Sequence, residues 1–261
     1  MARITPLFSG SSGNCIAIGG ADSFVLIDAG VSAKRITDAL RERDYDLSRL
    51  AGIFITHEHT DHVSGLRVFA SRAGVPVWAT EGTLCALDAV GHLAGVDARP
   101  CPAEGISVGG MHLRPLPTSH DTVESCGYAV TTADDRRAVI VTDTGVVSEK
   151  LHREILGCDL AYIESNHDVE MLLHGPYPPL LRQRILSERG HLSNDQCAAE
   201  VGAMLKSGTA RFLLAHISQE NNRPELAMQA VRRVLDACGA RPDRDYTLQA
   251  VPRCGLPLLV F

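Results

Sequence analysis

The chain has 261 residues, 45% of them hydrophobic and 21% charged, with a formal net charge of −6 at pH 7. This composition is typical of a globular protein with a sizeable core, and no apolar run approaches the roughly 20 residues of a membrane-spanning helix. The N-terminal segment lacks the apolar stretch of a secretory signal, so we expect a soluble cytoplasmic protein, and the negative charge argues against a protein that coats nucleic acid.

Apolar runs of strand length recur along the chain and are rich in Val, Ile and Phe. Because these runs end in polar residues or glycine, they are typical of strands buried on both faces. Two hairpins are predicted, one at Gly109 and Gly110 and one at Asp134 and Asp135. The predicted strands cover residues 24–28, 53–56, 75–79, 139–143, 160–164 and 211–216, and strands return after residue 238, over 246–251 and 256–261.

Helical patterns alternate with these strands. Ser32 is expected to begin a helix that ends near residue 43, and a second helix is predicted over residues 63–73. Ser193 or Asn194 can cap a helix that ends near residue 206, and Pro224 fits the first position of a last helix. No linker divides the chain, so we expect a single α/β domain over residues 1–261, in which helices cover mixed sheets.

The strongest chemical signal is the segment THEHTDH at residues 56–62, which directly follows a predicted strand. Alternate residues of an extended segment point the same way, so His57 and His59 can reach one metal ion. Asp61 and His62 follow at the start of the predicted helix and can face a second ion. Imidazole and carboxylate are ligands that zinc accepts, so the segment predicts a metal site.

Two ions need further ligands, and the remaining candidates lie beyond predicted strands, where loops display functional groups. His120, Asp143 and His216 each stand at or after the end of an apolar run, and His191 lies in the segment GHLSN before a predicted helix. For each histidine the alternative is a buried side chain that is bonded only to the backbone.

This arrangement resembles the metallo-β-lactamase superfamily, whose fold is a four-layer αββα sandwich. The motif residues follow one another in the family's order over nearly the whole chain. The resemblance implies two metal sites with these ligands: His57, His59 and His120 for the first ion, Asp61, His62 and His216 for the second, and Asp143 as the bridge.

The resemblance also implies the chemistry. A metal-bound hydroxide would be the nucleophile, because a bound divalent ion lowers the pKa of water towards about 7. Asp61 would take part in catalysis as well as in metal binding, and Asp28 and Glu164 would lie behind the ligands and orient them. Zinc suits this ligand set, and manganese also accepts His and carboxylate.

The segment GHLSN resembles the histidine motif of the RNase Z branch of this superfamily. In that branch the histidine is not a ligand, and it protonates the leaving oxygen of a phosphodiester. The resemblance therefore implies that His191 is a proton donor, a role that suits imidazole near neutral pH. The alternative is a residue at a helix entry that only bonds the backbone.

Three further segments, FSGSSGN at 8–14, ESNHD at 164–168 and SQENN at 218–222, resemble the YycJ (WalJ)-type proteins. This resemblance implies a DNA exonuclease that runs from 5′ to 3′, acts on DNA ends or gapped duplex, and is linked to DNA repair. A Gly/Ser turn can also offer N–H and hydroxyl donors to a phosphate. The candidate substrate-binding residues are Ser11, Ser12, Asn14, Asn166, His167, Ser193 and Asn194.

The sequence argues against one other class of enzyme and leaves two further interpretations open. Only 47 residues separate Asp143 from His191, so the inserted domain of β-CASP ribonucleases does not fit. A small-molecule phosphodiesterase or a glyoxalase-II-like thioester hydrolase would use the same metal ligands. A metal-stabilised scaffold for partner binding is the third alternative, although structural zinc sites are closed by four ligands and do not need seven.

Overall fold

The computed structural model describes residues 1–261, and the chain divides into two compact units that are described separately below. Unit 1 comprises Met1–Pro115, Thr122–Arg136 and Arg253–Phe261, and unit 2 comprises Leu116–Asp121 and Arg137–Pro252.

A seven-stranded sheet forms the centre of unit 1. In spatial order its strands are β14 (Leu259–Val260), β1 (Arg3–Phe8), β2 (Cys15–Gly19), β3 (Phe24–Ile27), β4 (Leu50–Phe54), β5 (Val77–Ala79) and β6 (Ala98–Pro100). β2 is antiparallel to both β1 and β3, whereas β3 to β6 are parallel. β1 and β3 therefore run in the same direction, and their carboxyl ends lie at the same edge of the sheet.

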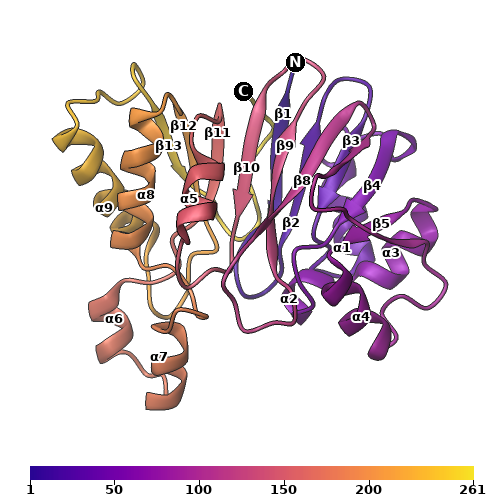
Figure 1. The fold of residues 1–261 in the computed structure, drawn as a ribbon, viewed down its shortest axis with the longest axis horizontal. Helices are drawn as coiled ribbons and strands as arrows, with labels where there is room; N and C mark the ends of the chain where they lie inside the picture. The colour runs from indigo at the N-terminus through magenta and orange to yellow at the C-terminus, as the bar shows by residue number, and fades with distance from the viewer. The chain divides into compact units, whose positions relative to one another are not determined.

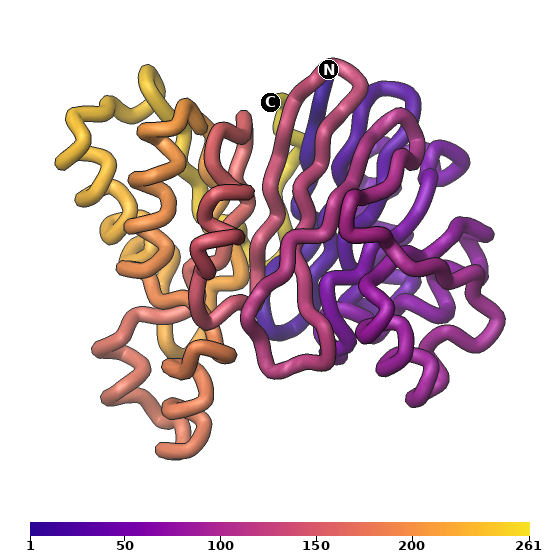
Figure 2. The backbone as a smooth tube through the Cα atoms, in the orientation of Figure 1, coloured from indigo at the N-terminus to yellow at the C-terminus, as the bar shows by residue number.

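The two ends of the chain meet in this sheet. β14 pairs with β1, with Val260 opposite Arg3, and Figure 2 shows the last residues lying beside the first strand. Arg43 holds the returning segment, because its guanidinium donates to the carbonyl oxygens of Cys254 at 3.0 Å and Leu256 at 3.3 Å.

Helices pack against the unit 1 sheet. Ser32 begins α1, as predicted, by accepting a hydrogen bond from the Arg35 N–H, and the helix buries an apolar stripe that includes Ile36 and Leu40. The helices of this unit are α1 (Ala33–Arg41), the short 3-10 helix η1 (Leu47–Arg49), α2 (Thr60–Val63), α3 (Leu66–Ala73) and α4 (Glu81–Ala89).

The single helix predicted over residues 63–73 is wrong, because α2 and α3 are separate. The break falls at Gly65, whose N–H donates to the Ala29 carbonyl at 2.9 Å. A Cβ at this glycine would lie only 1.9 Å from the Val31 carbonyl oxygen. The chain therefore interrupts the helix where two backbone segments touch.

Unit 1 also contains β7 (Ile106–Val108), β9 (Cys126–Thr131) and most of β8 (Met111–Pro117). β7 and β8 form the predicted hairpin, with Val108 opposite Met111 and both linking glycines at positive φ. After β9 the chain turns as predicted, and Asp135 adopts a left-handed φ of 56°.

Unit 2 is built on four parallel strands: β10 (Arg137–Val141), β11 (Leu160–Glu164), β12 (Arg211–Ala215) and β13 (Thr247–Ala250). Its helices are α5 (Glu149–Ile155), α6 (Val169–His174), α7 (Pro179–Ile185), α8 (Asn194–Lys206) and α9 (Pro224–Ala237). α8 and α9 lie side by side in Figure 1, and α9 packs on β13. Because the strands are parallel, their carboxyl ends share one edge of the sheet. No helix of the structure is both long and apolar enough to cross a membrane.

Candidate metal centre

Three predicted site residues leave their strands in an unusual backbone conformation. Asp28 follows β3 with φ 63°, Asp143 stands two residues after β10 with φ 56°, and His216 follows β12 with φ 51°. A left-handed conformation is uncommon outside glycine and costs of order 1–3 kcal/mol, so it persists only where the surroundings enforce it. The predicted strands 24–28, 139–143 and 211–216 extend too far for this reason, since each ends where a site residue turns out of the sheet.

The THEHTDH segment gathers three histidines in unit 1, between β4 and the end of α2. The ring centroids of His57 and His59 are 4.8 Å apart, and those of His57 and His62 are 4.0 Å apart. Asp61 joins them, with its Oδ2 3.5 Å from His62 Nε2. The structure therefore brings together the four predicted ligands of this segment.

Asp28 lies behind this cluster and is buried. It accepts a hydrogen bond from His62 Nδ1 at 2.7 Å and two more from the Thr56 N–H and hydroxyl, at 2.9 and 3.0 Å. Burial raises the pKa of Asp28, and these donors oppose the rise. The Thr56 hydroxyl also lies 3.0 Å from His57 Nδ1. This role of Thr56 was not predicted, because nothing in the sequence distinguishes a threonine at the end of a strand.

Asn14 connects the Gly/Ser turn to the same cluster. Its Nδ2 lies 3.0 Å from His62 Nε2 and 3.3 Å from Asp61 Oδ2, and its Oδ1 accepts from the Gly10 N–H at 2.9 Å. Ser11 and Ser12 at the tip of the turn are exposed. The turn therefore contacts two predicted ligands with one side chain and presents two hydroxyls to solvent.

A second cluster lies in unit 2. Asp143, Glu164, His191 and His216 each offer a ligand atom, and these atoms lie within 4.8 Å of one another. Glu164 Oε1 accepts from both histidines, from His191 Nδ1 at 2.7 Å and from His216 Nδ1 at 3.0 Å. Asp143 Oδ1 stands 3.6 Å from His216 Nδ1.

Glu164 is the buried centre of this cluster. Its second oxygen accepts the backbone N–H groups of Thr144 at 3.1 Å and Leu192 at 3.2 Å. Burial alone would raise the pKa of Glu164, but the two histidines that face it hold the pKa well below its usual range. Burial likewise disfavours the charged form of His191, and the Glu164 carboxylate outweighs it, so the pKa of His191 is raised.

His120 is held by the loop that carries His191. Its Nδ1 lies 3.0 Å from the Gly190 carbonyl oxygen, and its Nε2 stands 3.9 Å from Asp143 Oδ1. Burial lowers the pKa of His120, which favours the neutral imidazole that a metal ion requires.

The hydrogen-bond partners of three buried histidines show whether these residues fit a metal ion. In His62, His120 and His216 the Nδ1 atom faces a carboxylate or a backbone carbonyl oxygen. Ligating histidines in metalloproteins commonly donate one ring nitrogen to such a partner, which fixes the tautomer and directs the other nitrogen at the metal. The residues present therefore fit a metal ion of the kind that imidazole and carboxylate bind.

The remaining substrate-binding candidates in unit 2 are mostly buried. Asn166 Nδ2 donates to the His216 carbonyl at 3.0 Å, and burial lowers the pKa of His167 to about 4. Ser193 caps α8 in a capping box, as one of the two predicted alternatives, and Asn194 accepts from Ser165 at 2.7 Å. Both side chains thus bond within the protein, and contact of these four residues with substrate stays a prediction.

Comparison with known proteins places the chain in a family. A family described as the β-lactamase superfamily domain matches residues 24–217. The chain is 36% identical over 238 residues to exodeoxyribonuclease YycJ of Bacillus anthracis, covering 89% of each chain. It is 38% identical over 225 residues to exodeoxyribonuclease WalJ of Streptococcus pneumoniae, covering 85% of this chain and 83% of that protein. The chain belongs to the YycJ/WalJ family of the β-lactamase superfamily.

Solved structures agree on the fold. The metallo-β-lactamase-fold protein YhfI of Bacillus subtilis superimposes with a TM-score of 0.72 at 13% identity, covering 99% of this chain and 98% of that one. The predicted α/β fold of the metallo-β-lactamase type is thus confirmed. As a member of the YycJ/WalJ family the chain is a metal-dependent hydrolase, and its His and Asp clusters are compatible with a dinuclear metal site.

Proposed function

We propose that this chain is a two-metal phosphodiesterase that degrades DNA from its ends, with residues 1–261 acting as one catalytic domain in the cytoplasm. The names of the two bacterial relatives support an exodeoxyribonuclease activity. The direction from 5′ to 3′, the choice of ends or gapped duplex, and a place in DNA repair rest on the resemblance of the sequence motifs to that family.

The proposed ligands follow the order of the sequence motifs. Divalent ions, zinc or manganese, would supply Lewis acidity at the phosphate and would lower the pKa of a bound water. The Nδ1 contacts of His62, His120 and His216 support this assignment, because a carboxylate or carbonyl partner at Nδ1 is common in histidines that bind a metal through Nε2. The first ion would be held by His57, His59 and His120 and the second by Asp61, His62 and His216, and Asp143 would serve both.

The hydrogen bond between His191 and Glu164 is the observation that favours a phosphodiester as the substrate. Glu164 engages Nδ1 of His191 at 2.7 Å, which leaves Nε2 to deliver a proton to a leaving oxygen. The imidazole is partly exposed, with 17% of its side chain accessible, so a substrate can reach it. The same carboxylate holds His216, so one buried group positions both the proton donor and a proposed ligand.

A thioester hydrolase is the alternative with the same ligands. A thiolate is a good leaving group and departs without a proton, whereas the alkoxide of a nucleotide needs one. A buried carboxylate that bonds and orients His191 therefore favours the phosphodiester over the thioester.

Parallel assays of one metal-loaded preparation test the proposal. We would incubate it with DNA labelled at the 5′ or 3′ end, with RNA, with bis(p-nitrophenyl) phosphate and with a glutathione thioester. We expect mononucleotide release from DNA, with the 5′ label lost first, and little thioester cleavage. Faster turnover of the thioester than of any phosphodiester would refute the proposal.

A further inference from the structure

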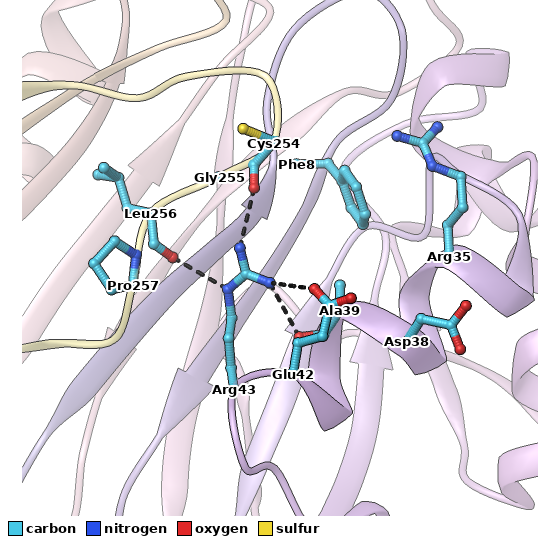
Figure 3. A pocket seen from close by; sticks show the side chains of 10 residues that line it. All are labelled: Phe8, Arg35, Asp38, Ala39, Glu42, Arg43, Cys254, Gly255, Leu256 and Pro257. Carbon is cyan, nitrogen blue, oxygen red and sulfur yellow. Dashed lines mark hydrogen bonds and ion pairs between the residues drawn. The ribbon is translucent and has the colours of Figure 1, made fainter.

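A cavity of 650 Å³ opens in unit 1 between α1 and the returning C-terminal segment. Figure 3 shows Phe8 and Arg35 on one side of it and Arg43 with the backbone of residues 254–257 on the other. Asp38 and Glu42 also line it. The cavity thus combines an aromatic ring, two guanidinium groups and two carboxylates.

Arg35 is the cation whose donors remain available in this cavity. Its guanidinium carbon lies 4.6 Å from the centroid of the Phe8 ring, and the guanidinium forms no hydrogen bond or ion pair within the chain. The Arg43 guanidinium already donates hydrogen bonds to the carbonyl oxygens of Cys254 and Leu256. The nearest acid on α1 is also engaged, because Lys34 Nζ lies 2.5 Å from Asp38 Oδ2. A stacked guanidinium with free donors is a preorganised phosphate-binding fork.

Phe8, one wall of the cavity, stands at the edge of the sheet from which the THEHTDH segment also leaves. Phe8 ends β1 and Asp28 follows the parallel strand β3, so both stand at the same edge. The Gly/Ser turn continues from Phe8 and packs on the segment before α1. A Cβ at Gly13, whose φ is 142°, would lie 2.2 Å from a methyl group of Val31. The turn therefore connects the cavity wall to the THEHTDH segment, because Asn14 at its end contacts Asp61.

We propose that this cavity and the adjoining Gly/Ser turn bind the backbone of the DNA strand next to the THEHTDH segment, with Arg35 as the phosphate-binding group. Ser11 and Ser12 are exposed on this turn, and their hydroxyls suit phosphate oxygens. The inference rests on the proposed function, since it specifies how the same site holds its substrate. Contacts to phosphate carry no sequence information, so the binding is independent of the bases.

Arg35→Ala, Arg35→Lys and a control, Arg41→Ala, test the inference. Arg41 is exposed in the last turn of α1 and does not line the cavity. We would measure binding of labelled DNA by fluorescence anisotropy across a salt series, together with kcat and KM for DNA and the rate on bis(p-nitrophenyl) phosphate. Circular dichroism confirms that each variant folds.

We expect Arg35→Ala to weaken DNA binding and raise the KM for DNA by roughly 10-fold, and to lower the slope of log affinity against log salt by about one. The loss on DNA should exceed any loss on the small diester. Arg35→Lys should recover part of the affinity, because the charge remains and the planar fork does not. Arg41→Ala should stay within about 2-fold of the unsubstituted protein.

The outcomes separate this inference from the proposed function. Binding that depends on Arg35 without hydrolysis of DNA would overturn the proposed function and leave the inference standing. Hydrolysis of DNA with equal affinity in the Arg35 and Arg41 variants would overturn the inference alone. A protein that neither binds nor cleaves DNA would overturn both.

Discussion

One carboxylate oxygen of Glu164, Oε1, accepts hydrogen bonds from two imidazole groups in unit 2, those of His191 and His216. Neither histidine can change its tautomer or ring orientation without breaking a buried, charge-assisted hydrogen bond. Nδ1 is bonded in the same way in both histidines. Their proposed roles, proton donation by His191 and metal binding by His216, therefore differ because of the surroundings of Nε2.

Replacement of His191 tests its role directly. His191→Ala should keep both metal ions and lower turnover of DNA by about 10²–10⁴-fold, the usual contribution of a general acid. The loss should shrink for bis(p-nitrophenyl) phosphate, because nitrophenolate departs without a proton. His174→Ala, at an exposed histidine of α6, serves as the control. Loss of a metal ion from the His191 variant would show that His191 is a ligand.

Thr56 offers a second test at this scale. Thr56→Val keeps the shape but removes the hydroxyl that donates to Asp28, so the orientation of His62 should loosen. We expect metal affinity to fall about 10–100-fold, as for other partners of metal ligands. Thr5→Val is the matched control, since it removes a buried hydroxyl bond to Tyr45 at 2.8 Å elsewhere in unit 1. Equal metal affinity in the two variants would contradict the role of Thr56.

Among the secondary-structure elements, the loop after β3 packs closely against the THEHTDH segment. A Cβ at Gly30 would lie 1.7 Å from the Asp61 carbonyl oxygen and 2.6 Å from the Asn14 backbone nitrogen. Both neighbours are backbone atoms, so they cannot rotate away as a side chain would. The position of Asp61 therefore depends on the absence of a side chain at residue 30.

Gly30→Ala should displace this loop. We expect a loss of about 1–3 kcal/mol in the free energy of unfolding, typical of overpacking, and weaker binding of metal. Gly20→Ala is the control, because a Cβ there meets nothing within 4 Å. Thermal melts and metal titrations of the two variants check this, and similar metal affinities would contradict it.

The helices and strands are easier to predict from the sequence than the residues at which they end. The strand at residues 160–164 coincides with β11, and the starts predicted for α1, α8 and α9 are confirmed by Ser32, Ser193 and Pro224. Such signals are local, since they depend on periodicity and capping within one turn. The missed break at Gly65 depends on contact with residues more than 30 positions away, which no local pattern records.

For the whole molecule, membership of the YycJ/WalJ family confirms the fold that the motif order implied. The histidine and aspartate motifs were visible because ligands must be particular residue types at particular spacings. The roles of Thr56, of the Gly190 carbonyl oxygen and of Arg35 were not visible. They arise from hydrogen bonds, stacking and cavity shape, which residue identity alone does not encode.

The metal content of the whole protein gives the last prediction. The proposed ligand set supplies three side chains to each ion and Asp143 to both, so we expect two divalent ions per chain by elemental analysis. Removal of the ions by a chelator should abolish turnover, and zinc or manganese should restore it. At a free metal concentration 100 times Kd, each site should stabilise the fold by about 2.7 kcal/mol, which a rise in Tm on metal addition would register.

Asp143→Ala should bind fewer ions and lose activity, whereas Asp134→Ala, in an exposed turn, should do neither. A protein purified without chelator that holds no metal, or an Asp143 variant with two ions and full turnover, would refute the two-metal assignment.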